Sequence, residues 1–140
     1  MADILKHLER LRNHEKRQAR IELTEAQNEK DVAEVELAEN VSHVQEIRDS
    51  TSADDPMEVA RYHAFRLRME MTRRRQSSRL NGASDRVDMC RNRLDSAVRR
   101  AQTIEKLLEQ RADEAAREAR KNEATMLDEL GLQGWWRKSA

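Results

Sequence analysis

Four histidines and one cysteine are the side chains in this sequence that could form a metal or nucleophilic site. His7 and His14 would share a helix face, but no cysteine lies near them and no His-x-x-x-His spacing occurs. Cys90 falls on an apolar seam, where a thiol is shielded and packs as a small hydrophobic group. We therefore expect no metal site, and we interpret these side chains, including His43 and His63, as surface or packing residues.

Motifs for phosphate binding and acid–base chemistry are also missing from the sequence. It contains no glycine-rich loop, and its carboxylates are spread along polar segments with no apolar pocket to gather them. We expect a protein with no catalytic residues, no enzyme activity and no cofactor.

Arginines are concentrated in the middle of the chain, at Arg66, Arg68, Arg79 and the run 73–75. Clustered basic side chains of this kind can bind nucleic acid. However, no aromatic residues alternate with them to stack on bases, and the acidic first third of the chain can neutralise them. We expect no nucleic-acid binding.

Trp135 and Trp136 stand out because aromatic residues make up only 3% of the chain. Exposed tryptophans are unfavourable unless they dock on a protein or lie at a membrane interface. With Arg137 and Lys138 beside them, the pair is compatible with peripheral membrane contact. A tail that folds back on the preceding helix is an equal alternative.

The composition favours long helices over a thick core. Charged residues reach 39%, against about 25% in an average domain. Such a chain can bury a narrow aliphatic seam along paired helices. No apolar stretch approaches the roughly 20 residues that span a bilayer, so we expect no transmembrane segment and no signal peptide. A single cysteine agrees with the reducing cytoplasm.

Two long helices are predicted, over residues 3–49 and about 56–130, with a loop at 50–55. Apolar residues recur every three or four positions in both. The only proline, Pro56, directly follows the loop and suits the first position of a helix. Asp55 can cap that helix, and Glu58 can complete a capping box.

Glycines predict where the second helix ends. Gly131 and Gly134 follow the last apolar positions and indicate a C-cap. A tail is therefore expected over residues 131–140.

The second helix carries the clearest coiled-coil pattern, with alternating steps of three and four from Leu80 to Leu108. Residues 1–55 hold 8 basic and 14 acidic side chains, whereas residues 61–100 hold 12 and 4. Opposite charges on the two arms favour pairing within one chain. The predicted fold is all-α: two long helices in an antiparallel coiled-coil hairpin, with the second helix longer and overhanging.

Pairing the apolar positions of the two helices gives a register in which Ala26 faces Leu80 and Ala19 faces Val87. In this register the first helix ends before the second does. Residues from about 105 to 130 would then form a single helix with an apolar stripe, which needs a partner to hold it.

Several blocks of the sequence resemble the flagellar export protein FliJ family. The most specific are residues 105–111 (Glu-Lys-Leu-Leu-Glu-Gln-Arg) and 127–130 (Leu-Asp-Glu-Leu). Tyr62 and Phe65 are similar to a Tyr-x-x-Phe at the start of the family's second long helix. The resemblance covers nearly the whole chain, and the Trp-Trp tail and arginine-rich middle depart from it.

The resemblance implies a component of flagellar type III protein export, shaped like the central stalk of rotary ATP synthases. It implies that the hexameric export ATPase binds the second helix near its exposed end. The residues implied are Lys106, Leu107, Glu109 and Arg111.

The resemblance also implies that Tyr62, Phe65 and Met69 bind the export gate protein of the membrane, and that the protein assists export chaperones. Packing in the hairpin seam is an alternative role for these three residues. The implied location is the cytoplasm, peripherally associated with the inner face of the cell membrane at the export apparatus.

Two other interpretations stay open at this point. The chain could be the related stalk protein of a virulence-type secretion system. It could also be a generic coiled-coil scaffold or homodimer, in which the seam from Leu80 to Leu108 pairs between chains.

Overall fold

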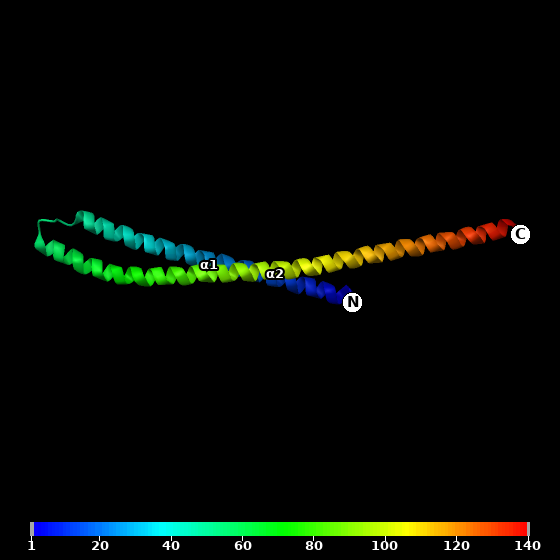
Figure 1. The fold of residues 1–140 in the computed structure, drawn as a ribbon, viewed down its shortest axis with the longest axis horizontal. Coiled ribbons are helices and arrows are strands. Elements are labelled where there is room, and N and C mark those ends of the chain that lie inside the picture. Colours follow the sequence, from blue (N-terminus) through cyan, green and yellow to red (C-terminus); the bar gives the residue numbers. More distant parts are fainter. Residues whose placement is uncertain (1, 140) are drawn as a thin grey trace. The chain divides into compact units, whose positions relative to one another are not determined.

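Two α-helices form the chain: α1 (Ala2–Ser50) and α2 (Pro56–Ser139), joined by a loop (Figure 1). This computed structural model describes the backbone of residues 2–139 and the side chains of residues 3–139. The predicted fold class is confirmed, because two long helices pack against each other and the second is the longer. No strand occurs within the described residues.

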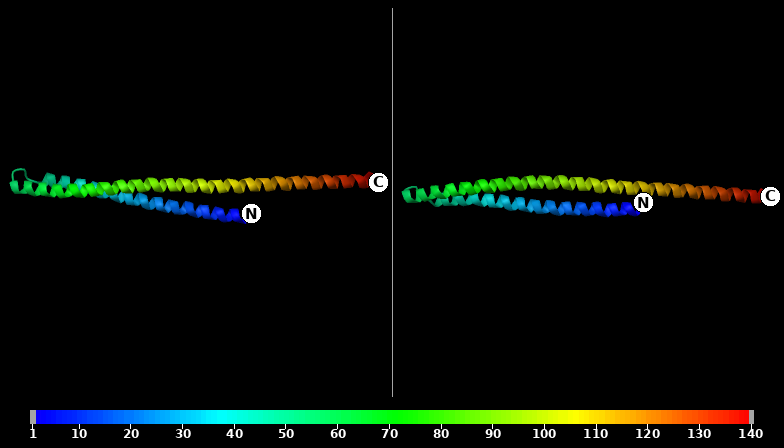
Figure 2. Two further views of the ribbon diagram at one scale, coloured as in Figure 1. Left: turned by 60° about the horizontal axis from the view of Figure 1, so that its bottom comes forward. Right: turned by 90° about the horizontal axis from the view of Figure 1, so that it is seen from below.

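The chain divides into two compact units. The hairpin unit is Glu15–Ala97, and the terminal unit comprises the described residues 2–14 and 98–139. In the hairpin unit, α1 and α2 run side by side in opposite directions from the loop. Both further views in Figure 2 agree with this pairing.

Local hydrogen bonds fix the start of α2. The Asp55 carboxylate accepts a hydrogen bond from the backbone N–H of Met57 at 3.0 Å, which is the helix cap predicted from the sequence. Glu58 does not complete a capping box. Its carboxylate accepts the N–H of Ser52 at 2.8 Å and so holds the loop.

The core of the hairpin unit is a narrow seam of small side chains. Ala26 is 0% exposed, Val87 1% and Cys90 4%, and Leu23 packs against this cluster. The buried residues of α1 in this unit recur every seven positions: Ala19, Ala26, Ala33 and Asn40. Because alanine side chains are small, the two helix axes can approach each other closely along this seam.

Around Val87 the register of the hairpin differs from the one expected from the sequence. Val87 packs against Ala26, whereas the apolar pairing placed it opposite Ala19 and placed Ala26 opposite Leu80. For Val87 the displacement is seven residues, or one heptad. A slip of one heptad keeps each seam position facing the partner seam, so the apolar periodicity cannot distinguish the two registers.

Ion pairs accompany the observed register at intervals of seven on both helices. The N–O distances are 3.8, 2.6 and 3.3 Å in the pairs Arg93–Glu22, Arg86–Glu29 and Arg79–Glu36. We call these pairs the charge ladder. Each pair is partly exposed and contributes only tenths of a kcal/mol. A slip of one heptad would leave Glu36 opposite Thr72, but it would pair Arg79 with Glu29 and Arg86 with Glu22 again. The ladder therefore accompanies the observed register without fixing it.

The predicted end of α2 near residue 130 is wrong. The helix continues to Ser139, and no described glycine has the positive φ that a glycine C-cap requires. Gly131 and Gly134 each cost the helix about 1 kcal/mol relative to alanine. Two good helix formers, Leu132 and Gln133, stand between them and keep the helix intact. The last residue of the expected tail, Ala140, lies outside the described residues.

Burial falls away along α2 within the terminal unit. Leu5 and Ala101 are buried, and Ile104 and Leu108 are half-buried. Every described residue from 109 to 139 is exposed. The terminal unit therefore presents a long stretch of helix whose apolar side chains face solvent.

Candidate protein-binding surfaces

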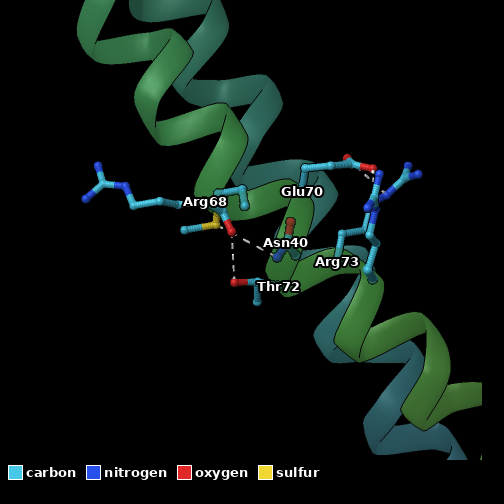
Figure 3. Close-up of polar contacts among 7 residues, drawn as sticks. Asn40, Arg68, Glu70, Thr72 and Arg73 are labelled. Carbon is cyan, nitrogen blue, oxygen red and sulfur yellow. Dashed lines mark hydrogen bonds and ion pairs between the residues drawn. The ribbon is translucent and has the colours of Figure 1, made fainter.

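The predicted gate-binding residues Tyr62, Phe65 and Met69 are all half-buried on α2. The Phe65 ring meets the His43 ring edge-on, with centroids 5.5 Å apart. The Asn40 amide donates a hydrogen bond to the Met69 sulfur at 3.8 Å (Figure 3). Phe65 and Met69 therefore contribute to helix pairing as well as to the surface.

An open groove of about 220 Å³ lies beside these residues, between α1 and α2. Tyr62 and Met69 line it, together with Val44 of α1. Arg66 and Glu70 also line it, so apolar walls meet charged side chains at the same site. The structure thus brings two of the three predicted residues to one surface that a peptide segment could enter.

Polar residues interrupt the seam next to this groove. Asn40 is buried, and on α2 the Gln76 side-chain oxygen is buried with no hydrogen-bond partner. A polar side chain at a seam position lowers stability but restricts the register and the number of helices. We infer that this half of the hairpin unit is held less tightly than the alanine-rich half around Val87.

The predicted ATPase-binding residues lie in the terminal unit where burial along α2 ends. Leu107 is 39% exposed, and Lys106, Glu109 and Arg111 are also exposed. Leu107 and Arg111 are four apart, and Lys106 and Glu109 are three apart, so each pair shares a helix face. Leu107 and Arg111 lie on a different face of the helix from Lys106 and Glu109, so the exposed segment presents an apolar residue and both charges around its circumference.

The two tryptophans remain on the helix. Trp135 is 60% exposed and Trp136 67%, and their rings meet edge-on with centroids 5.6 Å apart. The alternative of a tail folded back against the helix is therefore wrong. Among the described residues, neither helix has a stretch both long and apolar enough to cross a membrane.

Residues weighed for chemistry occupy ordinary packing and surface positions. His7, His14 and His63 are exposed, and Cys90 is buried in the seam. Within the described part of the chain, no group of three or more His, Cys, Asp or Glu side chains is placed to hold a metal ion.

A second apolar stripe on α2 is not predicted by the sequence analysis. We call it the outer stripe; its residues are Met57, Ala60, Ala64, Leu67 and Met71, all exposed. Their alternating steps of three and four are visible in the sequence. The seam through Tyr62 and Met69 covers the same segment, and two interleaved stripes obscure each other's period.

The paired helices, the narrow seam and the exposed faces define the class of protein as an antiparallel coiled-coil hairpin. The family model described as flagellar FliJ protein matches residues 1–140, the whole length. The chain belongs to the FliJ family, a non-enzymatic component of flagellar protein export. No curated protein and no solved structure matches it.

Proposed function

We propose that the protein is a stalk-like coiled coil that binds the hexameric export ATPase of the flagellum. The observation that carries the proposal is the uncovered part of α2, residues 109–139, in a chain of the FliJ family. A single helix gains little stability in water from its own hydrogen bonds. It gains much more when a partner covers its apolar side chains.

The ATPase contact is assigned to Lys106, Leu107, Glu109 and Arg111. These residues stand where burial along α2 ends, so a partner there would extend a seam that the terminal unit begins with Ile104. Their mixed charges would select a complementary surface.

Two further partners complete the proposal. The export gate protein of the membrane would bind at Tyr62, Phe65 and Met69, which is supported by the groove beside them. Export chaperones would be assisted by the same coiled coil. The protein would thus couple ATPase and gate in the cytoplasm at the inner face of the membrane, without turning over a substrate.

The structure and the family match favour this proposal over the two alternatives. The match is to the flagellar family rather than the virulence-type stalk. In addition, the residues of α2 that a homodimer would use, such as Val87, already pack against α1 of the same chain.

Replacing Leu107 by Asp is expected to weaken binding to the export ATPase at least tenfold. Leu107 is the apolar member of the proposed contact, and a carboxylate there would lose the apolar contact and would have to be desolvated when the ATPase binds. The measurement is titration of the purified ATPase with the full-length chain.

The matched control is Leu127→Asp, which changes another exposed leucine farther along α2. We expect it to leave the ATPase affinity within a factor of two. Equal effects of the two substitutions would remove the assignment to residues 106–111.

We also propose that the end of α2 contacts the membrane surface. Trp135 and Trp136 are exposed on a helix whose last turn carries Arg137 and Lys138. Tryptophan rings favour the headgroup region of a bilayer, and the basic side chains favour anionic lipids.

The substitution pair Trp135→Ala and Trp136→Ala is expected to abolish sedimentation of the full chain with vesicles that contain anionic phospholipid. The intact chain should sediment with those vesicles and much less with neutral ones, because the basic residues act only on charged lipid. Replacing Met126 by Ala is the control, since it removes one exposed apolar residue away from the tryptophans. Sedimentation that survives loss of both rings would refute the proposed contact.

A further inference from the structure

The outer stripe of α2 is an apolar surface that the hairpin unit leaves open. Met57 is 64% exposed, Leu67 70% and Met71 62%, and Ala60 and Ala64 are exposed between them. Single exposed apolar residues are ordinary. The five residues of the outer stripe differ from such isolated residues, because they follow one another at alternating steps of three and four. That spacing forms a coiled-coil seam about 21 Å long.

Three arginines follow one edge of the outer stripe at intervals of seven: Arg61, Arg68 and Arg75. Within the described part of the chain, none of these three arginines takes part in an ion pair, whereas Arg73, Arg74 and the arginines of the charge ladder do. In Figure 3 the Arg68 guanidinium points to the side opposite the Glu70–Arg73 pair. This edge therefore carries positive charge that the hairpin does not neutralise.

The charge ladder shows which kind of partner binds an apolar seam flanked by a row of arginines. On the inner face of α2, three arginines seven residues apart flank the buried seam, and each pairs with a glutamate of α1 at the same interval. The outer stripe repeats the apolar seam and the row of arginines. It lacks the opposing helix with its glutamates.

We propose that the outer stripe binds an amphipathic helix of another protein, whose apolar seam is flanked by acidic residues at seven-residue intervals. The bound helix would pack its apolar residues on Leu67 and Met71, and its carboxylates would reach Arg61, Arg68 and Arg75. A contact one helix wide and four turns long is small, so the complex forms transiently. This surface is separate from the residues assigned to the ATPase and the gate.

A second copy of the chain is a poor occupant. Its acidic helix is α1, and docking α1 of one copy on α2 of the next would leave an open stripe on the last copy. Such a head-to-tail contact does not close and would produce extended assemblies. Three glutamates of α1 are in addition already paired in the charge ladder.

The test uses the full-length chain and two synthetic helical peptides of three heptads with leucine at the seam positions. One peptide carries glutamate at the positions flanking the seam, and the other carries lysine there. Fluorescence anisotropy of the labelled peptides gives the two affinities. We expect the glutamate peptide to bind at least tenfold more tightly, with a preference that weakens as salt is raised.

Reversing the charge of the three arginines tests whether the peptides bind at the outer stripe or elsewhere on the chain. The triple substitution Arg61→Glu, Arg68→Glu and Arg75→Glu should invert the preference, so that the lysine peptide binds more tightly. The pair Leu67→Ser and Met71→Ser should weaken both peptides. Circular dichroism on each variant verifies that the helices are intact.

The matched control is the triple substitution Arg91→Glu, Arg99→Glu and Arg117→Glu, which changes the net charge equally at exposed positions away from the stripe. It should keep the preference for the glutamate peptide. Equal binding of the two peptides by the unaltered chain, or an acidic preference that survives reversal at Arg61, Arg68 and Arg75, would overturn the proposal. Neither outcome bears on the ATPase contact, because no ATPase is present.

Discussion

Replacing Val87 by Asp is expected to destabilise the hairpin unit by about 3–5 kcal/mol and to lower the melting temperature by more than about 12 °C. Val87 is the largest fully buried side chain among the described residues, and it packs against Ala26 and Cys90. The substitution removes its apolar contacts and places a carboxylate in a seam with no cation to pair with it. Thermal unfolding followed by circular dichroism measures the effect.

The control for this prediction is Met89→Asp on the same helix. Met89 is 54% exposed, so a carboxylate there stays hydrated and costs the fold only tenths of a kcal/mol. If both variants melted at the same temperature as the unaltered chain, the seam around Val87 would not be what holds the helices together.

Truncating the chain after Thr103 is expected to abolish binding to the export ATPase. The truncation removes the proposed contact at residues 106–111 together with the uncovered helix that follows it. The hairpin unit ends at Ala97 and should keep its helicity, because its seam is left whole. A pull-down of the ATPase with the truncated and full-length chains measures the loss.

A second truncation, after Lys121, is the matched control. It also removes the end of α2 with both tryptophans but keeps Lys106, Leu107, Glu109 and Arg111. We expect it to bind the ATPase as the full chain does. Loss of binding in this shorter deletion would move the contact toward the end of α2, and binding by the chain ending at Thr103 would refute the stalk proposal.

The fold class follows from the sequence because its signals are local and numerous. Steps of three and four from Leu80 to Leu108, one proline at Pro56 and opposite charges on the two arms leave few alternatives to a helical hairpin. Cys90 is in the seam for the same reason.

The register could not be obtained from the same pattern. Apolar periodicity repeats every heptad, so Val87 satisfies it equally against Ala19 or Ala26. The charge pairs share this period, because Arg86 pairs with Glu29 in the structure and would meet Glu22 after a slip of one heptad. Their individual energies are also small.

The docking surfaces were predictable to different degrees. The exposure of Leu107 follows from the unequal lengths of the helices. Half-burial of Phe65 and Met69 depends on side-chain contacts with His43 and Asn40, which the spacing of apolar residues does not reveal.

The end of α2 differs from the prediction because glycine weakens a helix without ending it unless the backbone turns left-handed there.

The charge ladder and the buried alanines share one period, and this makes the length of the hairpin adjustable in fixed increments. Consider a deletion of seven residues from α1 together with the seven that face them on α2. The apolar residues of the two helices would still face each other, the arginines would still face glutamates, and the loop would be unchanged. Each such deletion would shorten the reach of the arms by about 10 Å. Insertions and deletions that are not multiples of seven would rotate the apolar face or change the winding of the coil locally, so whole heptads are the steps that alter the span of this hairpin with the least disturbance.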